Sequence, residues 1–176
     1  MERLPRDPVT FREIVEADLR RAARLLIKIQ DEIDPQVRIA TPEGDYWIAL
    51  TLPPGDGERR ALLERLGLFM AWKRAAGFTF ASELVAPDAV YCAGIAATDQ
   101  LACLARITRV PRPWTAKSFG PVEWLADGSI DPLIAALLPR RPRAMTPREI
   151  AGLEAWFGAT GEFPAVHVPS GEVRGI

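Results

Sequence analysis

Three side chains in this sequence are suited to nucleophilic catalysis, but they are widely separated along the chain. The sole histidine is His167, and the two cysteines are Cys92 and Cys103. A cysteine or serine nucleophile needs an adjacent base, so any such pair would depend on His167 folding back onto another segment. The Gly-x-Ser-x-Gly nucleophile elbow is missing. Both cysteines lie in apolar runs without a CxxC motif, which favours two buried free thiols over a bridge between neighbouring strands.

Phosphate-binding and metal-binding patterns are also incomplete. The Gly-Asp-Gly segment at 55–57 precedes an expected helix, but the Walker lysine pattern and a complete GxGxxG are missing. Its aspartate and Glu58 would repel phosphate from that helix N-terminus. Asp31, Glu32 and Asp34 cluster where the first helix ends, which is typical of solvated surface. We therefore expect no catalytic, cofactor-binding or metal-binding residues and no cofactor.

One carboxylate interrupts an apolar strand. Glu83 lies in the segment 78–85, where Phe78 and Phe80 alternate with smaller residues. That alternation places Glu83 on the opposite face, where we expect it to meet solvent. The reversed register would bury Glu83, and a buried carboxylate with a perturbed pKa would be a functional candidate.

The most informative local feature is a basic, aromatic segment at 106–148. It holds eight basic and three acidic residues, whereas the whole chain holds 22 basic and 23 acidic residues. Three interpretations compete: a solvated face with its tryptophans in the core, a protein-binding surface, and a nucleic-acid surface. The candidate partner-binding residues are Arg112, Trp114, Lys117, Trp124, Arg140, Arg141 and Arg143.

Two capping boxes mark helix starts. Thr10 and Glu13 begin a helix that ends before Pro35. Its apolar residues recur at alternating spacings of three and four, which predicts a helix lying on its own sheet rather than a coiled-coil partner. Thr146 and Glu149 begin the last helix. A further helix is expected at about 57–76, with its N-cap at 56 and its C′ glycine at 77.

Strand patterns fill the space between these helices. Alternation and turn residues indicate strands at 37–40, 46–52, 78–85, 90–97 and 101–110, and a short one at 122–125. The connections after residue 78 are so short that neighbouring strands must be antiparallel. A short helix is expected at 132–138, where a proline follows an aspartate.

These elements predict an α+β fold with a mainly antiparallel sheet of about five strands. Their order is α-β-β-α-β-β-β, followed by a helical C-terminal third, with the helices on one face of the sheet. In element order alone, the pattern is similar to profilin-like and roadblock-like domains, and that analogy implies no function. We assign residues 1–158 to one domain and expect 159–176 to be a partly mobile tail.

Composition narrows the class of protein. The chain has 176 residues, 48 % apolar and 26 % charged, values near the average for a globular domain. They exclude collagen, wholesale disorder and a disulfide-dense mini-protein. No apolar run is long enough to span a membrane, and the N-terminal residues lack a signal-peptide core. We expect a cytoplasmic protein without a membrane partner, and 19 arginines against 3 lysines indicate a bacterial origin.

The functional hypothesis is a non-enzymatic protein-interaction or regulatory module. It would bind a protein partner, or a second copy of itself, through the first helix or the basic segment. The alternative is a small hydrolase that uses carboxylates in a pocket that the sequence does not reveal. A second alternative is nucleic-acid binding through the basic segment at 106–148, which the flanking acidic regions disfavour.

Overall fold

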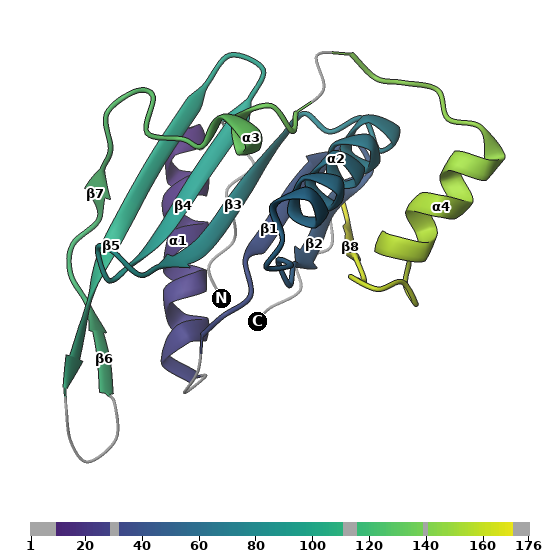
Figure 1. Cartoon of the computed structure of the whole chain (residues 1–176). Helices are drawn as coiled ribbons and strands as arrows, with labels where there is room; N and C mark the ends of the chain where they lie inside the picture. The colour runs from purple at the N-terminus through teal and green to yellow at the C-terminus, as the bar shows by residue number, and fades with distance from the viewer. Residues whose placement is uncertain (1–9, 29–31, 111–115, 139–140, 171–176) are drawn as a thin grey trace.

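The computed structural model describes residues 10–28, 32–110, 116–138 and 141–170. In these ranges the chain forms an antiparallel sheet with helices packed against both faces (Figure 1). Along the chain the elements are α1 (Phe11–Lys28), β1 (Gln36–Thr41), β2 (Gly44–Ala49), α2 (Asp56–Trp72), β3 (Gly77–Leu84), β4 (Ala89–Ala96), β5 (Gln100–Val110), β6 (Ala116–Phe119), β7 (Glu123–Trp124), α3 (Pro132–Ala135), α4 (Pro147–Phe157) and β8 (Val166–Pro169).

The sheet follows the order β6-β5-β4-β3-β1-β2-β8, and β7 also pairs with β5. Every pairing between the described strands is antiparallel. The predicted α+β class and antiparallel sheet are therefore confirmed. The predicted number of five strands is wrong, because the sheet has eight. The predicted helical C-terminal third is wrong as well, because β6, β7 and β8 all lie there beside two short helices.

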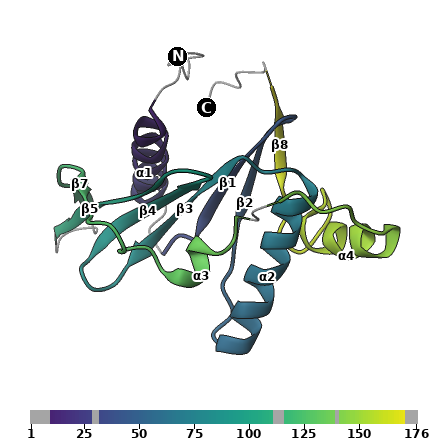
Figure 2. The same cartoon turned by 90° about the horizontal axis from the view of Figure 1, so that it is seen from above.

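Helices cover both faces of the sheet, which corrects the expected one-sided arrangement (Figure 2). Phe78 and Phe80 of β3 pack in one apolar cluster with α2 and α4, whereas Ala81 packs in a second cluster with α1. All five residues at 77–81 are buried. Burial on both faces leaves a strand without a polar side, so the alternation that signals a one-sided sheet is weak in β3 and β4.

The first helix lies on its own sheet, as predicted. Its apolar stripe packs on β3, β4 and β5 and is buried. The Glu13 carboxylate accepts from the Thr10 backbone N–H at 2.9 Å and from its hydroxyl at 3.1 Å. The approach is close at Gly94, where a Cβ atom would stand 2.3 Å from Val15 and 2.9 Å from Phe11.

The two cysteines are buried free thiols, as predicted. Cys92 of β4 and Cys103 of β5 stand directly opposite each other in the register, on the side of the sheet that α1 covers. Burial raises the pKa of Cys92 well above its usual value and raises the pKa of Cys103 to about 12. Both groups are therefore held as unreactive thiols.

Part of the segment assigned to a tail belongs to the sheet. Strand β8 pairs with β2, and Phe163 is buried against Phe157 and Trp156. The residues at 159–165 turn back through backbone hydrogen bonds to α4, including Phe163 N–H to the Trp156 carbonyl at 2.7 Å. The packed structure therefore continues past residue 158, to Ser170.

Candidate functional site

The candidate partner-binding residues that the structure describes do not form one surface. Lys117 of β6 and Trp124 of β7 lie against α1. Arg141 and Arg143 lie on the connector that precedes α4, at the opposite end of the molecule (Figure 1). Arg112, Trp114 and Arg140 lie outside the described residues. The basic residues of the segment 106–148 are therefore close in sequence but lie in separate parts of the structure.

Acidic side chains neutralise part of this basic segment. Arg106 pairs with Glu123 at 3.0 Å. Arg109 donates to Asp88 at 2.7 and 2.9 Å and to Glu83 at 2.7 Å. These hydrogen bonds raise the pKa of Arg109 and lower the pKa of Asp88. The sequence could not reveal this pairing, because two of the acids precede the segment by about twenty residues.

Glu83 differs from its expected position in solvent. The strand register is as predicted, but α1 covers the face to which Glu83 points, and its side chain is only 12 % exposed. One carboxylate oxygen binds Arg109, and the other is buried without a hydrogen-bond partner among the described residues. The ion pair gives Glu83 a structural explanation.

The tryptophans of the described ranges are each covered by a basic side chain of the same protein. Arg21 lies over Trp47 with its guanidinium carbon 3.6 Å from the ring centroid. The other pairs and their distances are Arg12 on Trp124 at 4.1 Å, Arg65 on Trp156 at 4.1 Å and Lys73 on Trp72 at 3.8 Å. A nucleic-acid base could stack on these ring faces only by displacing the cation.

Four residues on the α1 side of the sheet form what we call the buried ion network: Asp18, Arg38, Asp45 and Thr79. Asp18 of α1 is 6 % exposed, accepts from the Thr79 hydroxyl at 2.7 Å and lies 3.4 Å from Arg38 Nη1. Arg38 also pairs with Asp45 at 2.7 Å. Burial raises the pKa of Asp18, although Arg38 acts in the opposite direction. The network is internally satisfied, so it stabilises the contact between α1 and the sheet.

A different arrangement lies at the C-terminal end of α2, in an open hollow of about 390 Å³ that we call the basic hollow. One wall comes from the β1–β2 turn and the end of α2, and the other from the connector and the start of α4. Its lining residues are Pro42, Glu43, Trp72, Lys73, Arg74, Pro142, Arg143, Ala144, Met145 and Ile150. The lining therefore combines three basic side chains and one acidic side chain with several apolar ones.

The end of α2 presents the basic side chains of the first wall. The helix ends at Trp72, and Arg74 follows in the left-handed region with φ of 56°. Ala75 N–H bonds to the Met70 carbonyl at 2.9 Å, and Arg74 N–H bonds to the Ala71 carbonyl at 3.3 Å, which is a Schellman-type ending. The C′ residue is thus Arg74, three residues before the expected Gly77. The expected helix end is wrong, because Gly77 starts β3.

The second wall is fixed by the predicted capping box. The Thr146 hydroxyl accepts from Glu149 N–H, and the Glu149 carboxylate accepts from Thr146 N–H at 2.8 Å. Glu149 also pairs with Arg143. These hydrogen bonds lower the pKa of Glu149. The capping box therefore holds Arg143 and the neighbouring Met145 against the mouth of the hollow.

Within the described ranges, the basic side chains of the first wall have no acidic partner. Lys73 lies over Trp72 at 3.8 Å and 5.3 Å from the centroid of Tyr46. The Arg74 side chain is exposed and forms no hydrogen bond or ion pair with the residues that the structure describes. The single acidic lining residue is Glu43, whose backbone carbonyl is 3.3 Å from His167 Nε2. Sequence reasoning missed Lys73 and Arg74, because they read as solvated positions of a helix.

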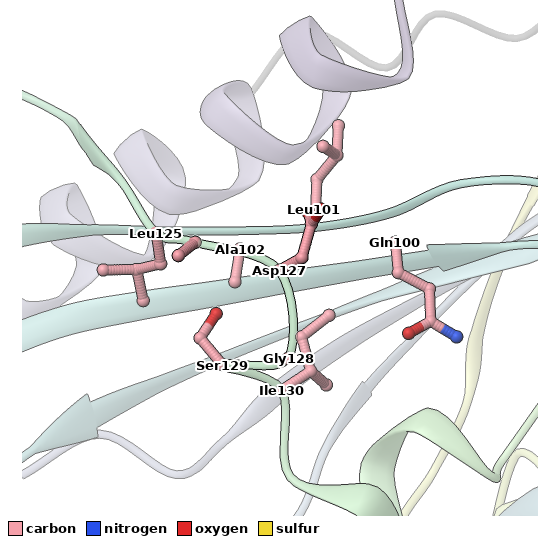
Figure 3. A pocket seen from close by; sticks show the side chains of 9 residues that line it. Gln100, Leu101, Ala102, Leu125, Asp127, Gly128, Ser129 and Ile130 are labelled. Atoms are coloured by element: carbon pink, nitrogen blue, oxygen red, sulfur yellow. The ribbon is translucent and has the colours of Figure 1, made fainter.

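A smaller hollow of about 190 Å³ lies under the loop after β7 (Figure 3). In it Leu101 points toward α1 while Gln100 points to the other side of the strand. The lining includes Ser129 and Ile130, and its one carboxylate is Asp127. Neither hollow brings two carboxylates together, and Asp18, whose pKa is raised, lines neither of them.

The sole histidine is far from the cysteines in the sheet. His167 of β8 stacks on Tyr46 with ring centroids 4.5 Å apart. Cys92 and Cys103 lie on β4 and β5, beyond β2, β1 and β3. A Cys–His pair is therefore not formed. Among the described residues there is no group of three or more side chains suited to a metal ion, and no described helix has the length and apolar character of a membrane span.

Comparison with known proteins gives no match: no family model, no curated protein and no solved structure matches this chain.

Proposed function

We propose that the protein is a non-enzymatic binding module of the bacterial cytoplasm that docks a segment of a partner protein in the basic hollow. One observation carries the proposal: two basic residues and two apolar residues line the same hollow. The basic residues, Lys73 and Arg74, lack acidic partners in the described structure, and the apolar ones are Trp72 and Met145. Arginine and tryptophan are enriched among the residues that dominate binding energy at protein interfaces.

The size and shape of the basic hollow support a short docked segment. Its volume of about 390 Å³ lies at the low end of the range for ligand sites. The hollow is open to solvent along the connector, which suits an extended segment held at one or two side chains. Arg143, one of the candidate partner-binding residues, forms part of this lining.

The alternatives have less support. The apolar stripe of α1 is buried on its own sheet, so α1 is a weak candidate for a partner helix. The alternative hydrolase would use paired carboxylates in a cleft, and each of the two hollows has one carboxylate in its lining. Base stacking would have to displace the cations that cover the tryptophan rings.

A variant that fills the hollow tests the proposed site. Ala144 is exposed on its lining, so Ala144→Trp would occupy the hollow without removing a charge. Peptides would be selected from a random display library on the wild-type protein and then measured against this variant. We expect the selected peptides to lose binding to Ala144→Trp while its melting temperature stays unchanged. Equal binding to both proteins would place the docking site elsewhere and overturn the proposal.

Self-association is tested separately by size-exclusion chromatography with light scattering. If the partner segment belongs to a second copy, the wild-type protein forms dimers and Ala144→Trp is a monomer. A wild-type monomer at high concentration would leave only a different protein as the partner.

A further inference from the structure

We infer that the segment docked in the basic hollow is acidic, with Asp or Glu residues beside one apolar anchor. This inference rests on the proposed function, since it names the chemistry of the partner at the same site. Its first basis is charge: the lining holds Lys73, Arg74 and Arg143 against Glu43. Arg143 is already paired with Glu149, so Lys73 and Arg74 are the cations left for a ligand.

Lys73 keeps its charge available because aromatic rings, rather than carboxylates, hold it. Its ammonium group lies 3.8 Å from the Trp72 centroid and 5.3 Å from the Tyr46 centroid. The rings orient the ammonium group without neutralising it. A carboxylate that approaches the hollow would therefore meet an oriented positive charge that donates no hydrogen bond to the described residues.

Arg74 provides the second, independent basis. Its φ of 56° places a residue with a side chain where helix endings usually have glycine. The left-handed conformation is unfavourable for a side-chain-bearing residue, and the exposed Arg74 side chain makes no hydrogen bond or ion pair with the described residues in return. Glycine would serve the backbone better at this position, and the exposed guanidinium is available to a ligand.

The apolar part of the lining requires an apolar anchor on the ligand. Trp72, Met145 and Ile150 are each partly exposed and line the same hollow. A purely ionic ligand would leave this surface in water, whereas an apolar side chain flanked by carboxylates satisfies both parts. The ring face of Trp72 is already covered by Lys73, which favours an acidic peptide over a stacked nucleotide base.

The test uses peptides selected from a random display library on the wild-type protein, with the oligonucleotide rU12 as the nucleic-acid probe. Each is measured by fluorescence anisotropy against Arg74→Glu. The matched control is Arg24→Glu, a charge reversal at an exposed position of α1. Arg74→Ala is the second charge variant, and thermal melting confirms that each variant is folded.

We expect the selected peptides to be enriched in Asp and Glu. They should bind Arg74→Glu roughly tenfold or more weakly and bind Arg24→Glu with wild-type affinity. Selected peptides that lack acidic residues but still fail to bind Ala144→Trp would overturn the acidic chemistry and leave the proposed function standing. Peptides that bind Ala144→Trp normally would overturn both. Binding of rU12 that depends on Arg74 would make the hollow a nucleic-acid site and would also overturn both.

Discussion

The two sides of the sheet differ in whether their charged side chains have partners of opposite charge. On the α1 side, Arg38 pairs with both Asp18 and Asp45 in a largely buried network. On the α2 side, Lys73 and Arg74 line an open hollow without acidic partners among the described residues. The fold itself explains the first set of charges, and we propose that the second set binds a ligand.

This difference follows from the cost of burial. A charge that is removed from water needs a partner at close range, so Asp18 and Arg38 must hold each other. An exposed charge is solvated by water and needs no protein partner, so its side chain can contact a ligand. Residues of the buried ion network should therefore affect stability, whereas residues of the basic hollow should affect binding.

The largest expected effect is on the buried ion network. Arg38→Met removes the cation that contacts both Asp18 and Asp45 and leaves a buried carboxylate unpaired. We expect a loss of about 3–5 kcal/mol in the free energy of unfolding, measured by urea denaturation. The double variant Arg38→Met with Asp18→Asn should recover part of the loss, because no unpaired buried charge remains. A loss below about 1 kcal/mol would mean that the network behaves as a surface ion pair.

The pH dependence of stability is the second test of that network. Burial raises the pKa of Asp18 above its usual value of 3.8, so the folded state binds this proton more tightly than the unfolded state. The stabilisation is complete below the unfolded pKa and is lost as the pH rises through the folded pKa. Unfolding free energies over an acidic to neutral pH series should therefore show the wild type losing stability relative to Asp18→Asn. Parallel profiles for the two proteins would show that the Asp18 carboxyl does not cause the pH dependence of stability.

The smallest expected effect is that of a substitution in the basic hollow on the free energy of unfolding, and it is a gain rather than a loss. Arg74→Gly relieves the left-handed backbone at the end of α2. After the entropy of glycine in the unfolded chain is included, we expect a gain of about 0.5–1 kcal/mol. Thermal melting measures it, with Arg74→Ala as the control that removes the guanidinium but keeps the strained Cβ. A destabilised Arg74→Gly would show that the arginine does serve the fold.

Local patterns predicted the elements of this fold well where one segment contains the whole signal. The capping box of Thr146 and Glu149 and the antiparallel run from β3 to β5 are examples. The short strands β6 and β8 were missed because each is too short to show a clear alternation of its own. Each is a strand because it pairs with a neighbour, β6 with β5 and β8 with β2. The second covered face was missed because small residues such as Ala81 and Gly94 give no strong apolar signal.

The candidate site was harder to predict than the fold. The basic segment at 106–148 is continuous in sequence, but Arg109 finds its acids on β3 and on the turn before β4. The hollow instead combines the end of α2 with Arg143 and Met145, about seventy residues later. A charge count along the chain cannot show which charges are paired, because pairing depends on the register of the sheet.

The most direct measurement is the affinity of a selected acidic peptide for Arg74→Gly, compared with the wild type in the same anisotropy titration. If the cations of the basic hollow serve a ligand, this variant binds the peptide roughly tenfold more weakly even though its fold is more stable. Unchanged affinity in the more stable variant would contradict the account, because Arg74 would then serve neither the fold nor the ligand.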